Sequence, residues 1–231
     1  MKIMTFNTQH CKSYLQREIN IPMMAQVIRD CAPDVVGLNE MYDQGERPEF
    51  TAQTKELARL ADYPYHFFAK AIDVAGNNPY GNGILSRIRI VNAEVIPIPD
   101  PVPHAYEGYY ETRCLLKAEL ENGVTVLVTH FGLNPDEQKN AVNTVLAHLK
   151  SEKCVLMGDF NVLPDNPVLA PIRARMQDTA TAFAEPLLSY PSDAPDRKID
   201  YVFVSPDYKI CAADIPAVVA SDHRPHTAEV C

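Results

Sequence analysis

The chain has 231 residues, of which 46% are hydrophobic and 22% are charged, as is usual for a globular protein. Its formal net charge of −9 disfavours non-specific binding to long nucleic acids, which depends on Lys and Arg side chains that neutralise phosphates. No apolar run approaches the roughly 20 residues that span a bilayer, and the first residues lack the pattern of a signal peptide. No repeat or Gly/Ser-rich linker interrupts the sequence, so we expect one domain, residues 1–231, in the cytoplasm.

Apolar, β-branched runs predict about ten strands along the chain. In chain order these strands are Lys2–Phe6, Asp34–Asn39, Tyr65–Ala69, Asn82–Ser86, Ile88–Pro97, Glu111–Glu121, Thr125–Thr129, Lys153–Met157, Ile199–Val204 and Thr227–Val230. The pair Asn122-Gly123 separates two of these runs and predicts a tight hairpin between them.

Helices are predicted between some of these strands. Asn20 precedes Ile21-Pro22, a pattern typical of a capping residue and an early proline, and the helix should end near Cys31. Asn134 and the Pro-Asp-Glu that follows it repeat the pattern, with acidic residues in the first turn of a helix that runs to about residue 150. Thr51–Ala61 is the third predicted helix.

The balance of about ten strands against three or four helices is too rich in strands for a doubly wound parallel sheet. Hairpins mixed with strand–helix–strand units instead favour an α+β fold, with two mixed β-sheets packed together and helices on the outside. Six scattered cysteines contain no C-x-x-C pair, and none lies beside a His or a Gly-rich turn. We expect them to be small buried side chains rather than disulfides, zinc ligands or nucleophiles: Cys11, Cys31, Cys114, Cys154, Cys211 and Cys231.

Four predicted strands run directly into polar side chains that can coordinate a metal or transfer a proton. The first ends at Asn7 and the second at Glu40, while two later strands end at His130 and Asp159. One such case would be uninformative, because polar residues often mark the ends of strands. Four cases with these residue types indicate that a packed pair of sheets gathers a site at one rim.

Asp159 and Asn161 lie two residues apart in the sequence GDFN, with Phe160 between them. An extended backbone would direct both polar side chains to one face, where a carboxylate can accept a proton and an amide can orient a phosphate oxygen. An ordinary Asx turn at the end of a strand explains the same residues equally well. Both interpretations stay open at this point.

Further polar residues occur near the carboxyl terminus. Asp200 opens an apolar strand, and a carboxylate paired with a His ring fixes the tautomer of that ring. Asp222 and His223 are adjacent, so they share a site only where the chain bends, which Pro225 favours. We expect the other histidines outside the strand ends to be ordinary surface or core residues: His10, His66, His104, His148 and His226.

Eight short blocks in chain order resemble the endonuclease/exonuclease/phosphatase superfamily of metal-dependent phosphoesterases, which includes deoxyribonuclease-I-like nucleases and neutral sphingomyelinases. The resemblance extends from residue 5 to residue 225 and implies a four-layer α/β/β/α sandwich. The blocks are TFN (Thr5–Asn7), VVGLNE (Val35–Glu40), YGNGILSR (Tyr80–Arg87), ETR (Glu111–Arg113), THFG (Thr129–Gly132), GDFN (Gly158–Asn161), IDYVFVS (Ile199–Ser205) and SDHRP (Ser221–Pro225).

The resemblance implies roles for the metal and for the attacking water. Glu40 is similar to the principal Mg²⁺ ligand, and Asn7 and Asp222 to ligands or close neighbours of the metal. Asp159 is similar to the residue that orients or deprotonates the water, with Asn161 beside it. Because all proposed ligands are oxygen donors, Mg²⁺ or Mn²⁺ is expected rather than zinc.

The resemblance also implies roles around the phosphate. His223, paired with Asp200, is similar to the histidine on the scissile phosphate, and His130 to a second histidine on the phosphate or leaving group. Asn82 and Arg113 are similar to phosphate contacts. We therefore expect a hydrolase that cleaves a phosphate ester, most simply a phosphodiester, by direct attack of water.

The substrate class stays open in the sequence. A small phosphodiester, a phospholipid head group, a sugar phosphate and a short nucleic acid all fit, as does a phosphomonoester, and neither a membrane span nor a protein partner is evident. The Pro- and Tyr-rich segment 97–110 is predicted to be a long loop, either an ordinary surface loop or a lining of the specificity pocket. The alternative from another class is a catalytically inactive module that binds phosphorylated ligands.

Overall fold

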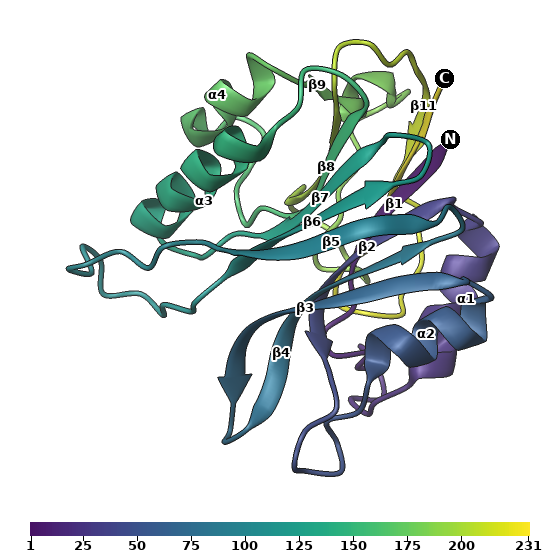
Figure 1. The fold of residues 1–231 in the computed structure, drawn as a ribbon, viewed down its shortest axis with the longest axis vertical. Coiled ribbons are helices and arrows are strands. Elements are labelled where there is room, and N and C mark those ends of the chain that lie inside the picture. The colour runs from purple at the N-terminus through teal and green to yellow at the C-terminus, as the bar shows by residue number, and fades with distance from the viewer.

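The computed structural model describes residues 1 to 231 and contains two mixed sheets of six strands each (Figure 1). The first sheet contains, in spatial order, β11 (Ile210–Asp214), β12 (His226–Val230), β1 (Lys2–Asn7), β2 (Val35–Tyr42), β4 (Asn78–Ser86) and β3 (Tyr65–Val74). The second contains β5 (Ile90–Pro97), β6 (Cys114–Leu120), β7 (Thr125–His130), β8 (Cys154–Asp159), β10 (Asp200–Val204) and β9 (Gln177–Asp178).

Helices cover the outer face of each sheet. The first sheet is covered by α1 (Ile21–Cys31) and α2 (Gln53–Ala61), and the second by α3 (Pro135–His148) and the short α4 (Ala170–Arg173), as Figure 1 shows. Single turns of 3-10 helix occur at Pro167–Leu169 and Thr179–Ala182. None of these helices has the length and apolar character that a membrane crossing requires. The predicted four-layer α/β/β/α sandwich, with two mixed sheets flanked by helices, is confirmed.

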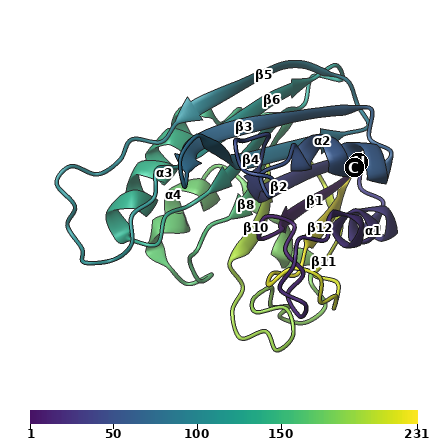
Figure 2. The same ribbon diagram turned by 90° about the horizontal axis from the view of Figure 1, so that it is seen from below.

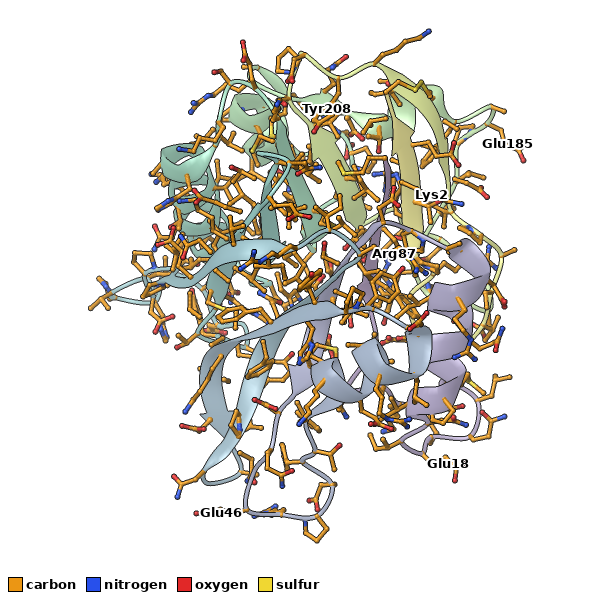
Figure 3. The ribbon with its side chains drawn as sticks, turned by 45° about the vertical axis from the view of Figure 1, so that its right-hand side comes forward. Lys2, Glu18, Glu46, Arg87, Glu185 and Tyr208 are labelled. Carbon is orange, nitrogen blue, oxygen red and sulfur yellow. A yellow bond between two sulfur atoms is a disulfide. The ribbon has the colours of Figure 1, made fainter.

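The two sheets pack face to face over an apolar layer, and side chains fill the space between them (Figure 3). Val35 of β2, Val128 of β7 and Met157 of β8 belong to this layer. Gly37 lies where the sheets pack tightly, because a Cβ atom there would come within 2.7 Å of Sδ of Met157. Each sheet also packs against its own helices through one further apolar cluster.

Each sheet contains one parallel strand pair joined by a helix. β1 and β2 are connected through α1, and β7 and β8 through α3. The α1 crossover begins at Asn20, whose side chain accepts a hydrogen bond from the amide of Met23 at 3.0 Å. In α3 the carboxylate of Glu137 accepts one from the amide of Asn134 at 3.0 Å. Parallel pairing brings the carboxyl ends of the joined strands to one edge of the sandwich, where all four predicted polar positions lie.

All ten predicted strands are present, but several boundaries differ from the predictions. The strand predicted to begin at Glu111 begins at Cys114, so residues 111–113 precede the strand and lie outside the sheet. The strand predicted to end at Ala69 continues to Val74, where it pairs with an equally extended β4. Two strands, β9 and β11, were not predicted. The segment between β5 and β6 is a long loop that projects beyond both sheets near α3 (Figure 2).

The expectation that no cysteine forms a disulfide is wrong. Cys211 and Cys231 are bonded to each other, because β11 pairs antiparallel with β12 and brings the two sulfurs together. The remaining four are free thiols: Cys11, Cys114 and Cys154 are buried and Cys31 is half-buried.

Candidate active site

The ends of the two parallel strand pairs meet at one point. His130 and Asp159 are register partners at the ends of β7 and β8, and Asn7 ends β1 in the opposite sheet. The amide Nδ2 of Asn7 lies 3.1 Å from Oε1 of Glu40 and 3.1 Å from Oδ2 of Asp159. One buried amide therefore links a carboxylate from each sheet. Glu46, labelled in Figure 3, belongs to the loop that follows β2 at this edge.

Glu40 has an unusual backbone. Its φ is +58°, and the register between β2 and β4 shifts between Leu38 and Met41, which marks a bulge. A residue with a Cβ atom rarely adopts this conformation, and bulges re-aim side chains at the rims of sheets. The bulge directs the Glu40 side chain into the cavity beside His10, whose Nε2 lies 3.7 Å from Oε2 of Glu40.

The GDFN sequence forms a turn at the end of β8. The amide of Asn161 donates to Oδ1 of Asp159 at 2.9 Å and Asn161 has φ of +52°, so the residues form an Asx turn rather than a continued strand. That turn nevertheless keeps both polar side chains on the cavity, while Phe160 packs against Phe131 in the core. Nδ2 of Asn161 donates to the carbonyl of Phe131 at 2.9 Å and lies 3.2 Å from Nε2 of His130.

His223 lies between two buried carboxylates. Its Nδ1 is 2.9 Å from Oδ2 of Asp200 and its Nε2 is 3.6 Å from Oδ2 of Asp159. Residues 220–225 leave the strand pattern before β12 begins, and Asp222 and His223 both face the cavity through this bend. Burial lowers the pKa of His223, but the charges of Asp200 and Asp159 outweigh this effect and raise the pKa to about 10. The ring is therefore a charged donor at neutral pH.

Negative charge is concentrated in the same place. Burial, the largest cause, raises the pKa of Asp159 to about 7. Burial also raises the pKa of Asp222, and the nearby charge of Glu40 adds to that rise. Carboxylates forced together in a low-dielectric pocket lower their free energy by sharing a cation. Their oxygen atoms form a donor set that suits a hard divalent ion.

These groups line a cavity of about 520 Å³. Seven of the ten predicted site residues lie on its surface: Glu40, Arg113, His130, Asp159, Asn161, Asp222 and His223. The other three, Asn7, Asn82 and Asp200, are buried behind it. Oδ1 of Asn82 accepts from Asn39 at 2.8 Å and its Nδ2 donates to the carbonyl of Cys114 at 3.0 Å, so its amide is already paired within the protein.

Several cavity residues were not predicted as site residues. They include one histidine, four tyrosines, an acid and an arginine: His10, Tyr42, Tyr80, Tyr109, Glu111, Tyr190 and Arg197. His10 lies three residues beyond the end of β1. This position just after a polar strand end was the signal in the sequence that His10 could belong to the site. Burial lowers its pKa to about 4, which leaves the ring neutral. Tyr109 belongs to the predicted loop 97–110, which therefore contributes to the cavity wall.

Comparisons with known proteins identify the family and the fold of the chain. The model of the Endonuclease/Exonuclease/phosphatase family matches residues 4–223. An endonuclease/exonuclease/phosphatase from Beutenbergia cavernae is 27% identical, with a TM-score of 0.81 over 100% of this chain and 71% of that one. No curated protein sequence matches the chain.

Two more distant structures share the fold. A mannosyl-6-phosphatase from Bacteroides thetaiotaomicron is 13% identical, with a TM-score of 0.76 over 100% of this chain and 99% of that one. The human Nocturnin catalytic domain is 14% identical, with a TM-score of 0.70 over 100% and 94%. The family match over nearly the whole length, together with these folds, shows that the chain belongs to the endonuclease/exonuclease/phosphatase family, and this membership indicates a phosphoesterase hydrolase.

Proposed function

We propose that this chain is a divalent-metal-dependent hydrolase that cleaves a phosphodiester by direct attack of water. One observation carries the proposal: Oδ2 of Asp159 lies 3.5 Å from Nε2 of His130 and 3.6 Å from Nε2 of His223, at the base of a cavity that also contains Glu40 and Asp222. A proton acceptor, two imidazoles and oxygen ligands for a cation thus surround one space.

The carboxylates fit Mg²⁺ or Mn²⁺. Glu40 and Asp222 would hold the ion, with Asn7 fixing the orientation of Glu40 through its amide. Asp159, Asp200 and His223 also place ligand atoms within 4.8 Å of one another. Nδ1 of His223 is already bonded to Asp200, and a protonated ring has no lone pair for a metal, so we assign this second group to proton transfer. The bound cation would polarise a phosphoryl oxygen and stabilise charge on the leaving oxygen.

The protein's own residues supply the remaining chemistry. Asp159, with its pKa raised to about 7, is matched to neutral pH as the group that orients water and accepts its proton. His223 donates from Nε2 to a phosphate oxygen while Asp200 holds the other side of its ring. His130 and Asn161 complete the wall that faces the developing negative charge.

The cavity limits the substrate. A volume of about 520 Å³ accommodates a small molecule or the end of a short nucleic acid, and the net charge of −9 disfavours a long duplex. Phosphomonoesters are the second candidate class, because one structural neighbour is named as a mannosyl-6-phosphatase. A sphingomyelinase-like lipid phosphodiesterase uses the same ester chemistry, and an inactive phospho-ligand-binding module is the remaining alternative.

A turnover assay tests the proposal. The purified protein should hydrolyse bis-p-nitrophenyl phosphate with Mg²⁺ or Mn²⁺, and Asp159→Asn should lower kcat by roughly 100-fold or more. Asp165→Asn makes the same change on the exposed surface and should keep wild-type turnover. Undiminished turnover in Asp159→Asn would contradict the assigned role. Faster cleavage of p-nitrophenyl phosphate than of the diester would favour the phosphomonoesterase.

A further inference from the structure

Both ring nitrogens of His130 face possible hydrogen-bond donors, although a neutral imidazole accepts at only one nitrogen. Nη1 of Arg113 lies 2.9 Å from Nδ1, and Nδ2 of Asn161 lies 3.2 Å from Nε2. The guanidinium is charged and its contact is shorter, and charge-assisted hydrogen bonds are roughly twice as strong as neutral ones. Nδ1 of His130 therefore accepts from Arg113, and the ring proton is on Nε2.

The surroundings of Nε2 agree with this tautomer. The amide Nδ2 of Asn161 already donates to the carbonyl of Phe131 at 2.9 Å, so it loses little when His130 does not accept from it. Oδ2 of Asp159 lies 3.5 Å from Nε2 of His130 and is an acceptor. The Nε2–H group of His130 therefore points toward the Asp159 carboxylate and into the cavity.

Arg113 is itself held in place by Glu111. Their Oε1 and Nη1 atoms are 2.5 Å apart, and the side chains are only 13% and 10% exposed, so solvent screens the pair weakly. The backbone amide of Glu111 donates to Oε1 of Glu137 at 3.2 Å, which fastens the segment before β6 to the first turn of α3. This ion pair restricts the guanidinium to a position beside His130.

We propose that Arg113, held by Glu111, is a positioning residue that keeps His130 neutral with its proton on Nε2, ready to donate to a phosphate oxygen or leaving group. This inference rests on the proposed phosphoesterase function of the same cavity. It replaces a direct contact between Arg113 and the phosphate with an effect exerted through His130. The site then contains two histidines in different states, a charged His223 between carboxylates and a neutral His130 beside an arginine.

Nitrogen-15 NMR of the histidine rings at pH 7 tests the tautomer without any substrate. In the wild-type protein, His130, assigned with His130→Gln, should show a protonated Nε2 and an unprotonated Nδ1. Arg113→Met should give a mixture of tautomers, whereas Arg113→Lys, which keeps a cationic donor, should retain much of the Nε2–H form. Should Arg113→Met leave Glu111 unpaired and prevent folding, the double change Glu111→Gln with Arg113→Met removes both charges. An unchanged Nε2–H tautomer in the folded variant would overturn the proposal.

A kinetic cycle tests how Arg113 acts on the reaction. Arg113→Met should lower kcat by roughly 100-fold with little change in KM, because the Nε2–H donor is lost from the transition state. In a His130→Ala background, the same change should cost almost nothing further. Full additivity, or a rise in KM instead of a fall in kcat, would show direct phosphate binding by Arg113 and contradict the proposal. If the wild-type protein hydrolyses no phosphate ester, the proposed function fails while the NMR result still decides the tautomer.

The exposed ion pair of Glu56 and Arg59 on α2 supplies a matched control. Arg59→Met and Glu56→Gln make the same chemical changes outside the cavity. Neither should alter the His130 tautomer, kcat or KM.

Discussion

The backbone conformation of Glu40 allows the effect of this residue on stability to be measured separately from its proposed role in metal binding. The residue is held at φ of +58°, a conformation that costs an L-residue about 1–2 kcal/mol and costs glycine almost nothing. Replacing Glu40 with alanine removes the carboxylate but keeps that strain, whereas replacing it with glycine removes both. The two variants lose the same contact with Asn7, so their difference in unfolding free energy isolates the backbone term.

The expected magnitude follows from two opposing terms. Relief of strain favours the glycine variant over the alanine variant by about 1–2 kcal/mol, and the greater freedom of glycine in the unfolded chain offsets about 0.5–1 kcal/mol of this gain. Glu40→Gly should therefore be more stable than Glu40→Ala by about 0.5–1 kcal/mol. At Glu94, an exposed residue of β5 with an ordinary backbone, the order should reverse, and the alanine variant should be more stable by a similar amount.

Urea unfolding followed by circular dichroism measures these differences, and calorimetric titration with Mg²⁺ measures the function. Both Glu40 variants should lose Mg²⁺ binding, while the Glu94 pair should keep it. If Glu40→Gly is less stable than Glu40→Ala, the strain argument fails. If Mg²⁺ still binds with wild-type affinity, the ligand assignment of Glu40 is wrong.

Three further predictions concern the metal, a buried histidine and the packing of the sheets. Mg²⁺ at about 100 times its Kd should raise the unfolding free energy by about 2.7 kcal/mol in thermal melts, and Asp222→Asn should abolish much of that gain. Burial holds the pKa of His226 well below its ordinary value, so its neutral ring stabilises the fold fully above about pH 6.5 and progressively less below it. Between pH 7 and pH 5, denaturant titrations should show the wild type losing about 2 kcal/mol relative to His226→Gln. Gly37→Ala should cost about 1–3 kcal/mol in the same titrations, and the double variant with Met157→Ala should lose less than the sum of the two single losses, because the new Cβ meets the Met157 side chain.

Sequence reasoning located most residues of the candidate site because several of them end buried strands. Asn7, His130 and Asp159 each follow a run of mostly apolar and β-branched residues, and such runs are the feature of a sequence that is easiest to recognise. The crossover helices α1 and α3 make the strand pairs parallel, so these ends converge. The roles of the individual side chains could not be predicted in the same way, because they depend on hydrogen bonds between distant segments.

Other features could not be predicted from the pattern of apolar residues. His10 lies among three consecutive residues with positive φ, a loop conformation that sequence periodicity does not reveal. The disulfide between Cys211 and Cys231 depends on β11, a strand of five residues whose two alanines have little preference for strands. The resemblance suggested that Asn82 contacts phosphate, and this role stays a prediction, although the structure pairs its amide with Asn39 and with the backbone at Cys114.

The interior asparagines explain how the two sheets form one edge that contains the candidate site. The middle of the intersheet layer is apolar and could tolerate small sliding movements, because apolar contacts are not directional. At the edge, Asn39 donates to the carbonyl of Thr129 at 2.9 Å and accepts from the amide of Asp159 at 2.9 Å, while Asn7 binds the Asp159 carboxylate at 3.1 Å. A buried hydrogen bond is costly to leave unmade, so these contacts allow only one register between the sheets. The same amides that fix the register also set the direction of Asp159, so the proton transfer that we propose for Asp159 would depend on correct docking of the sheets.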